Sequence, residues 1–348
     1  MGLGTVLRTK SFLLYPLYLF LFLLVIDKIF LLPTFHEEFL QAGNSVFYFQ
    51  RKSLAKRMFA DDKLNQTNLA LVFGDSRSYP FSELGIPENK RKSWTLYNFS
   101  VPQSVPMYSY LNLNQVLEKG VKPKVVILSL SPEAFDDTKG FLLSPFLRMG
   151  CDSECRDLVW DYIPSKEKWE YVLDHIFAVR GVELNLSLFT SRLKQGKLKE
   201  YKSLYNKEFQ LLNYTKGDYL MYGSMENPEE KLKKDTARIS NLYMRSYKMG
   251  TSQLPFFEKF IKLTNEKGIK TIVVWPKVYG DYYQFYDKFN VRDVWWEKIK
   301  AVGKPYGTIF IDMNTESSCN LFNDASHQSV FCFIEQMDSI WRTHLQEF

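Results

Sequence analysis

Histidine, cysteine and blocks of like charge are scarce in this sequence, and each scarcity narrows the possible functions. The 348 residues include four histidines and four cysteines, without the CxxC spacing or histidine pair of a zinc site. The net charge is +6, but no long lysine or arginine block and no helix-turn-helix or RNP motif accompanies it, which argues against nucleic-acid binding. Charged residues make up 24% of the chain and hydrophobic residues 45%, typical of a globular protein. We therefore expect no metal or organic cofactor and no nucleic-acid partner.

The clearest regional feature is an apolar run from Ser11 to Ile26, which Asp27 and Lys28 interrupt and residues 29–33 extend. The uninterrupted run is slightly shorter than the ~20 residues that span a bilayer, and the extension supplies the missing length. A cleaved signal peptide is the alternative, but no small-x-small cleavage site follows closely. Basic residues before the run predict a cytoplasmic N-terminus and an exported body. We expect residues 1–35 to form a cytoplasmic tip and a transmembrane signal anchor.

The four cysteines fit an exported domain. Cys151 and Cys155 lie four residues apart, and Cys319 and Cys332 flank the C-terminal motif described below. Disulfides persist mainly outside the cytoplasm. We hypothesise disulfides within these two pairs, of which the second would close a loop around a candidate catalytic aspartate and histidine.

Five short apolar runs rich in β-branched residues predict the strands of a parallel sheet buried on both faces. They span residues 68–73, 94–98, 124–130, 269–275 and 308–312. Helical patterns at 107–118 and 253–267 alternate with them, which is typical of a doubly wound α/β sandwich. We expect a polar, helical stalk at 36–66 and one domain at 67–348. That domain would contain a helical insertion at about 136–250, interpreted as a cap over the site.

Ser76 is the candidate nucleophile. It belongs to the motif Gly74-Asp75-Ser76, directly after the first predicted strand. Glycine permits a tight strand-to-helix turn, and a serine at a helix N-terminus lies where backbone N–H groups and the helix dipole can stabilise an oxyanion. Serine and aspartate are also ordinary N-cap residues, so the motif alone leaves a purely structural role open.

A second motif supplies a candidate base, His327, with Asp324 three residues before it and after the last predicted strand. An aspartate at this spacing can accept the Nδ1 proton, which leaves Nε2 to deprotonate a serine. Of the other histidines, His36 lies beside the predicted anchor, His175 in the insertion, and His344 has no carboxylate three residues before it. His327 therefore completes the most plausible triad with the candidate nucleophile.

Two further residues follow predicted strands and are candidate oxyanion or substrate-binding groups. Asn98 ends the second strand and could offer its side-chain amide or position the loop that follows. Ser131 follows the third strand. Both residue types also form ordinary turns, and spacing alone does not choose between the two roles.

Together these residues resemble the SGNH/GDSL hydrolase superfamily, in which a GDS-type nucleophile motif follows the first strand and a DxxH motif lies near the C-terminus. Gly74-Asp75-Ser76 and Asp324-Ala325-Ser326-His327 match those two blocks. In place of the GxND block the chain has Ser131-Pro132-Glu133-Ala134, so the usual asparagine donor is missing. With Phe135, this segment looks like the Ser-Pro-Gln-x-Phe element of the DltD family. The anchor and insertion also resemble the membrane-linked SGNH proteins of bacterial polysaccharide O-acetylation.

The resemblance implies a three-layer, flavodoxin-like α/β/α fold and a serine-nucleophile esterase or O-acyltransferase on the outer side of a bacterial membrane. Its substrate would be an envelope glycan or an acyl-carrying small molecule, and a membrane-bound acyltransferase would be a possible partner. Glu133 is the feature that opposes this function, because an ionised carboxylate in an oxyanion hole would repel the developing charge. The alternative is an inactive SGNH scaffold that binds or assembles envelope components.

Overall fold

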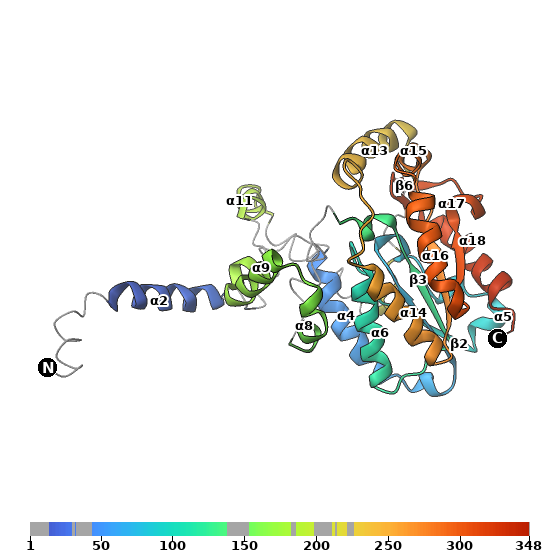
Figure 1. Ribbon diagram of the computed structural model, residues 1–348, viewed down its shortest axis with the longest axis horizontal. Coiled ribbons are helices and arrows are strands. Elements are labelled where there is room, and N and C mark those ends of the chain that lie inside the picture. The colour runs from blue at the N-terminus through green and yellow to red at the C-terminus, as the bar shows by residue number, and fades with distance from the viewer. Residues whose placement is uncertain are drawn as a thin grey trace.

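The computed structural model of the chain describes residues 14–29, 32, 44–137, 153–181, 186–197, 211–212, 214–220 and 226–347. Its centre is a five-stranded parallel sheet in the order β2-β1-β3-β4-β5 (Figure 1). The strands are β1 (Asn68–Phe73), β2 (Trp94–Asn98), β3 (Val125–Ser129), β4 (Lys270–Trp275) and β5 (Ile309–Asp312). All five predicted strands are confirmed, to within one residue at each end.

The strand order determines where a ligand-binding crevice can form. The chain passes from β1 outward to β2 on one side and then to β3 on the other side of β1. In doubly wound sheets of this order, the loops at the carboxyl ends diverge at such a switch point and leave a crevice. The residues that follow β1 and β3 therefore lie at the expected position for a site.

Both faces of the sheet are buried, which explains why the strands read as continuous apolar runs. In β1, Ala70 and Val72 point to one face and Leu71 and Phe73 to the other, and all four side chains are fully buried. The sheet consequently lies between two layers of helices.

The two helical layers differ in size. One face is covered by α4 (Asn44–Phe59), α6 (Pro106–Glu118), α14 (Leu254–Glu266), α15 (Gly280–Lys288) and α16 (Glu297–Gly303). The other is covered by α17 (Met313–Glu316), α18 (Phe333–Ser339) and the π-helical turn Ile340–His344. A short helix, α5 (Glu88–Arg91), precedes β2. The helices predicted at 107–118 and 253–267 correspond to α6 and α14.

Helix α4 lies within the segment that the sequence predicts to be a stalk. Its side chains Leu54 and Met58 are fully buried in the same apolar cluster as β1. Arg51 of this helix is also buried and donates hydrogen bonds of 3.0 and 2.7 Å to the carbonyl of Ser100, in the loop after β2. Because α4 buries both apolar and charged side chains, it is part of the domain rather than a solvated extension of it.

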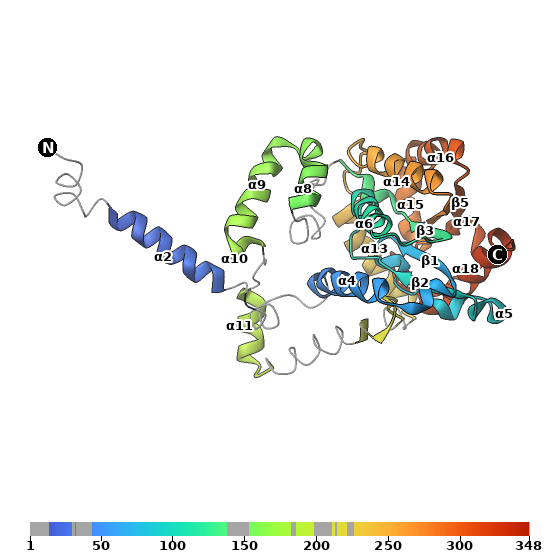
Figure 2. The ribbon, with the colours of Figure 1, turned by 90° about the horizontal axis from the view of Figure 1, so that it is seen from below.

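The segment predicted as a helical insertion, residues 136–250, connects β3 to β4. Its described helices are α8 (Ser153–Val159), α9 (Ser165–Ile176), α10 (Ala178–Gly181), α11 (Leu186–Lys194) and α13 (Glu229–Tyr243). Figures 1 and 2 show α9, α10 and α11 displaced from the sheet toward the N-terminal end of the molecule. Helix α13 instead packs against α15 and the short strand β6 (Phe322–Asp324).

Helix α2 (Tyr15–Ile29) extends away from the body of the molecule (Figure 1). At its end, the carboxylate of Asp27 accepts hydrogen bonds from the backbone N–H groups of Ala178 (2.6 Å) and Val179 (2.9 Å) in α10. Among the described helices, none is both long enough and apolar enough to cross a membrane. The predicted anchor at 1–35 lies partly outside the described residues.

Candidate active site

The candidate nucleophile lies on a tight turn directly after β1. Ser76 begins a short 3-10 helix (Ser76–Ser78), and the Asp75 carboxylate caps it by accepting a hydrogen bond from the N–H of Arg77 (2.9 Å). Gly74 makes the turn possible, because its φ is +155° and a Cβ there would lie 2.7 Å from Ser129. The local sequence thus places the Ser76 side chain at the carboxyl edge of the sheet.

The predicted triad residues lie within hydrogen-bonding distance of one another. Ser76 Oγ is 2.7 Å from His327 Nε2, and His327 Nδ1 is 2.9 Å from both carboxylate oxygens of Asp324. A carboxylate only accepts hydrogen bonds, so this network assigns the proton to Nδ1 and leaves Nε2 to accept from the serine hydroxyl. This is the geometry required for general-base activation of a serine.

The environment of Asp324 keeps it ionised. Burial by itself would raise the pKa of Asp324, but His327 and the hydrogen bonds that the carboxylate accepts outweigh it, so that the pKa lies well below its ordinary value. Oδ1 accepts from the N–H of Ser326 at 2.8 Å, the hydroxyl of Ser326 at 3.0 Å and the N–H of His327 at 3.0 Å. Fixed in this way, the carboxylate can orient the imidazole and stabilise its protonated form.

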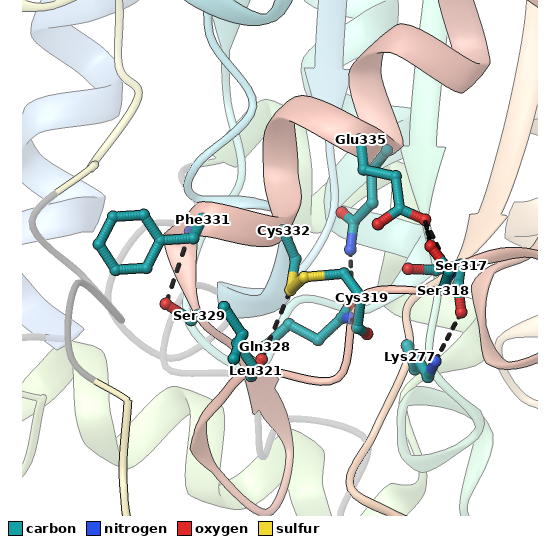
Figure 3. Close-up of a disulfide and its surroundings, with 11 residues drawn as sticks. Lys277, Ser317, Ser318, Cys319, Leu321, Gln328, Ser329, Phe331, Cys332 and Glu335 are labelled. Atoms are coloured by element: carbon teal, nitrogen blue, oxygen red, sulfur yellow. Dashed lines mark hydrogen bonds between the residues drawn. A yellow bond between two sulfur atoms is a disulfide. The ribbon is translucent and has the colours of Figure 1, made fainter.

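Asp324 and His327 belong to a small antiparallel hairpin, β6 (Phe322–Asp324) and β7 (His327–Gln328). A disulfide between Cys319 and Cys332, with a Cα–Cα distance of 5.6 Å, links the segments on either side of it (Figure 3). Gln328 also donates a hydrogen bond of 2.8 Å to the carbonyl of Cys319. The hairpin is therefore closed at its base. Cys155 is disulfide-bonded as well, whereas Cys151 lies outside the described residues.

Asn98 does not face the nucleophile. It is fully buried, and its amide nitrogen donates to the carbonyls of Ser78 (2.8 Å) and Phe81 (3.0 Å), while its oxygen accepts from the N–H of Ser100 (2.9 Å). Of the two roles that the sequence allows, the amide is committed to positioning the loops that follow β1 and β2. Both functions of the amide are thus bonded to backbone groups, which matches the loop-positioning role and not that of a side-chain oxyanion donor.

Ser131 and Glu133 also contact residues near Ser76 instead of forming an oxyanion hole. Ser131 donates a hydrogen bond of 2.6 Å to Asp75 Oδ2. Glu133 forms two parallel hydrogen bonds with the guanidinium group of Arg77, at 2.9 and 3.2 Å. Burial by itself would raise the pKa of Glu133, but Arg77 lowers it below its ordinary value. The carboxylate is thus ionised, and its charge is compensated within the protein.

Three residues of the site do not stand out in the sequence: Arg77, Tyr282 and Tyr286. The two tyrosines come from successive turns of α15, and their hydroxyls donate to Glu133 Oε1 at 2.7 and 2.9 Å. Their i, i+4 spacing is a recognisable signal, but it predicts only a shared helix face and not its buried partner. Arg77 follows the nucleophile directly, yet an arginine in a first turn is by itself unremarkable.

A cavity of about 370 Å³ lies on the α15 side of the hairpin. Its walls include Lys277, Tyr279, Asn314 and Phe322, and the N–H of Tyr279 donates a hydrogen bond of 3.0 Å to the carbonyl of Ala325. Ser76, Asp324 and His327 are not among the residues that line this cavity. Within the part of the chain that the structure describes, no group of three or more His, Cys, Asp or Glu side chains could hold a metal ion.

The fold and these contacts define an α/β protein with a Ser–His–Asp arrangement at the carboxyl edge of a parallel sheet. The sequence model of the family described as Protein of unknown function (DUF1574) matches residues 7–344, and the chain belongs to that family. No match is found among curated proteins. The family match includes the N-terminal apolar run as well as every strand of the sheet.

Proposed function

We propose that this protein is a serine-nucleophile acyl-ester hydrolase or O-acyltransferase of the SGNH type. The single observation that carries the proposal is the contact chain from Ser76 Oγ to His327 Nε2 (2.7 Å) and from Nδ1 to Asp324 (2.9 Å). A chance surface histidine would have neither contact. The position of the serine, after β1 at the switch point of the sheet, is where α/β folds place their ligands.

In the proposed reaction, Ser76 Oγ attacks the carbonyl carbon of an ester or thioester while His327 Nε2 takes the hydroxyl proton. Asp324 stabilises the imidazolium that results. The backbone N–H of Ser76 is the proposed donor to the oxyanion. As the tetrahedral intermediate collapses, His327 returns the proton to the departing alcohol or thiol, leaving an acyl group on Ser76. Water or a hydroxyl of an acceptor then attacks this acyl-enzyme by the same route in reverse.

The proposed location is the outer side of a bacterial membrane, with the N-terminal segment as the anchor. The apolar run at 11–26 and the basic residues before it support this topology. The Cys319–Cys332 disulfide and the bonded Cys155 support an oxidising compartment. An envelope glycan or an acyl-carrying small molecule is the proposed substrate, and a membrane-bound acyltransferase is the proposed partner. These follow from the resemblance to membrane-linked SGNH proteins.

A specific observation favours a second candidate, an SGNH scaffold that binds envelope components without catalysis. The amide of Asn98 is occupied by backbone carbonyls, and Glu133 stands where the superfamily has its asparagine donor. Fewer side-chain donors are then available to an oxyanion, and removing one such donor typically costs about 100-fold or more in rate.

Covalent labelling with a fluorophosphonate probe tests the proposed function. The full-length protein is expected to label, and Ser76→Ala is expected to abolish labelling. Ser93→Ala is a matched control, because within the described part of the chain the hydroxyl of Ser93 donates a surface hydrogen bond to the nearby carbonyl of Lys90 and to no catalytic residue. A folded wild-type protein that does not label, or labelling retained in Ser76→Ala, would favour the binding scaffold.

A further inference from the structure

Arg77 contacts both halves of the candidate site. Its backbone follows the nucleophile Ser76, and its Nε donates a hydrogen bond of 3.0 Å to the carbonyl of Ser326, the residue before His327. The two loops that supply serine and histidine are separated by 251 positions in the chain. Arg77 is thus a direct link between the turn after β1 and the β6–β7 hairpin.

The guanidinium group is itself held in one orientation. Its side chain is 8% exposed and forms a bidentate pair with Glu133, while Asp75 Oδ2 lies 4.0 Å from Nη1. Tyr282 and Tyr286 donate to the same Glu133 oxygen and fix the carboxylate in turn. A planar fork with both Nη groups on one carboxylate leaves Nε pointing in a single direction, which a lysine cannot reproduce.

From this geometry we propose that Arg77 is a positioning residue, which holds the hairpin against the nucleophile turn so that His327 Nε2 stays in hydrogen-bonding distance of Ser76. Glu133, Tyr282 and Tyr286 act through Arg77 as its support. The expected effect on catalysis rests on the proposed function. The alignment of His327 with Ser76 does not depend on that function and can be tested separately. From the sequence alone, the Glu133 carboxylate argues against catalysis. In the proposed arrangement it instead supports Arg77 and so helps to align Ser76, His327 and Asp324.

The physical reason is the steep dependence of proton transfer on geometry. A misplacement of reacting groups by about 1 Å can lower a rate about 100-fold. The hairpin has strands of only three and two residues, so its own ladder cannot fix its position. A buried, charge-assisted contact from Arg77 adds a constraint that ties the hairpin directly to the turn carrying Ser76.

Arg77→Lys is the decisive variant, with Arg292→Lys as its matched control. Arg292 also forms a partly buried ion pair, with Asp312, and among the described residues the hydrogen bonds of its guanidinium group go to Asp312 and Tyr283, outside both catalytic loops. Hydrolysis of p-nitrophenyl acetate by the full-length protein is expected to show a kcat about 100-fold lower in Arg77→Lys, with KM little changed. Glu133→Gln keeps the shape of the acceptor and is expected to give a partial loss of about 10-fold. Arg292→Lys should retain the wild-type kcat.

A second measurement does not depend on activity. The readout is the resonance of the His327 Nδ1 proton, hydrogen-bonded to Asp324, in NMR spectra to be recorded on protein with ¹⁵N-labelled histidine. This resonance is expected to shift or broaden in Arg77→Lys and to stay unchanged in Arg292→Lys. If Arg77→Lys does not fold, the Tyr282→Phe/Tyr286→Phe double variant, which removes only the two hydroxyls from Glu133, takes its place with the same expected direction.

The two proposals fail in different ways. If the wild-type protein neither labels nor hydrolyses the ester, the proposed function is overturned, and the NMR comparison still decides the positioning role. If the wild-type protein is active and folded Arg77→Lys keeps both its kcat and the His327 resonance, the positioning role is overturned while the enzymatic function stands.

Discussion

The two halves of the candidate site are built in different ways. The turn that carries Ser76 directly follows β1 of the central sheet: the carbonyl of Gly74 accepts a hydrogen bond of 3.0 Å from the N–H of Val101, in the loop after β2, and the hydroxyl of Ser78 donates to the carbonyl of Asp75 within the turn. The hairpin that carries Asp324 and His327 has no strand in that sheet. It is fixed from outside, by a disulfide and by contacts from distant segments.

Those outside contacts come from several directions. Besides the Arg77 link and the disulfide, the N–H of Asn227 donates to the carbonyl of Phe322, and the N–H of Tyr279 donates to that of Ala325. A site assembled from one rigid half and one cross-linked half can lose its alignment without unfolding. Substitutions on the two sides should therefore separate activity from stability, as the following predictions specify.

The largest effect is expected from Asp324→Asn, on the hairpin side. The amide favours the wrong imidazole tautomer, so kcat for ester hydrolysis should fall about 10⁴-fold with the fold intact. Steady-state kinetics measures the fall in kcat, and a circular dichroism spectrum checks that the fold is intact. Asp338→Asn, on the exposed surface of α18, is the control and should have wild-type kinetics. Comparable rates in the two variants would remove Asp324 from the mechanism.

On the sheet side of the site, Gly74→Ala should lower the stability of the protein. The added Cβ would lie 2.7 Å from Ser129 and from the hydroxyl of Ser78, at a backbone conformation that side chains rarely adopt. We expect the free energy of unfolding to fall by about 3 kcal/mol, measured by urea denaturation. Gly280→Ala is the matched control, because a Cβ there meets nothing within 4 Å. Equal midpoints for the two variants would mean that the turn after β1 is not tightly packed.

Removing the Cys319–Cys332 cross-link should loosen the hairpin more than the sheet. The cysteines are separated by 13 positions, and closing a loop of that size stabilises a protein by about 2 to 3 kcal/mol. In Cys319→Ala/Cys332→Ala, hydrogen exchange should accelerate at the amides of β6 and β7 and change little in β1. A uniform increase across both regions would contradict the independence of the two halves.

Acid should have the smallest effect and should act through the two buried carboxylates. Asp324 and Glu133 have pKa values below their ordinary 3.8 and 4.5, so each stabilises the folded state above its ordinary pKa. That stabilisation is lost as the pH falls through the lower, folded value. Unfolding free energies measured from pH 7 to pH 3 should therefore decline below about pH 4. The decline should be shallower in Asp324→Asn and in Glu133→Gln, and a parallel decline in all three proteins would argue against this linkage.

Much of the sheet and the two motifs that carry Ser76, Asp324 and His327 could be predicted because their signals are local. Continuous apolar runs such as 69–73 are typical of strands buried on both faces, and Gly74 marks the turn that follows. The spacing of Asp324 and His327 fixes which residues can share a proton. Neither inference requires knowing what lies across the crevice.

The partners of polar side chains could not be predicted in the same way. Asn98 is an equally good oxyanion donor or loop anchor on sequence grounds, and only the positions of the carbonyls of Ser78 and Phe81 decide between them. The segment that forms α4 is interpreted as polar from its sequence, yet its side chains Arg51 and Met58 are buried. Arg51 donates hydrogen bonds to the loop after β2, and Met58 packs in the apolar cluster against the sheet. Such contacts join residues that are far apart in the chain, so they produce no periodic pattern of residues from which they could be predicted.

Sequence by itself determined the five strands, the serine after β1 and the aspartate–histidine motif, since each depends on neighbours within a few positions. The groups that compensate the charge of Glu133 are visible only in the tertiary structure. An isolated glutamate beside an oxyanion would repel it, whereas this one is compensated by Arg77 and two tyrosine hydroxyls. The effect of a buried charge depends on the groups packed around it, and here those groups come from two separate elements, the turn after β1 and helix α15.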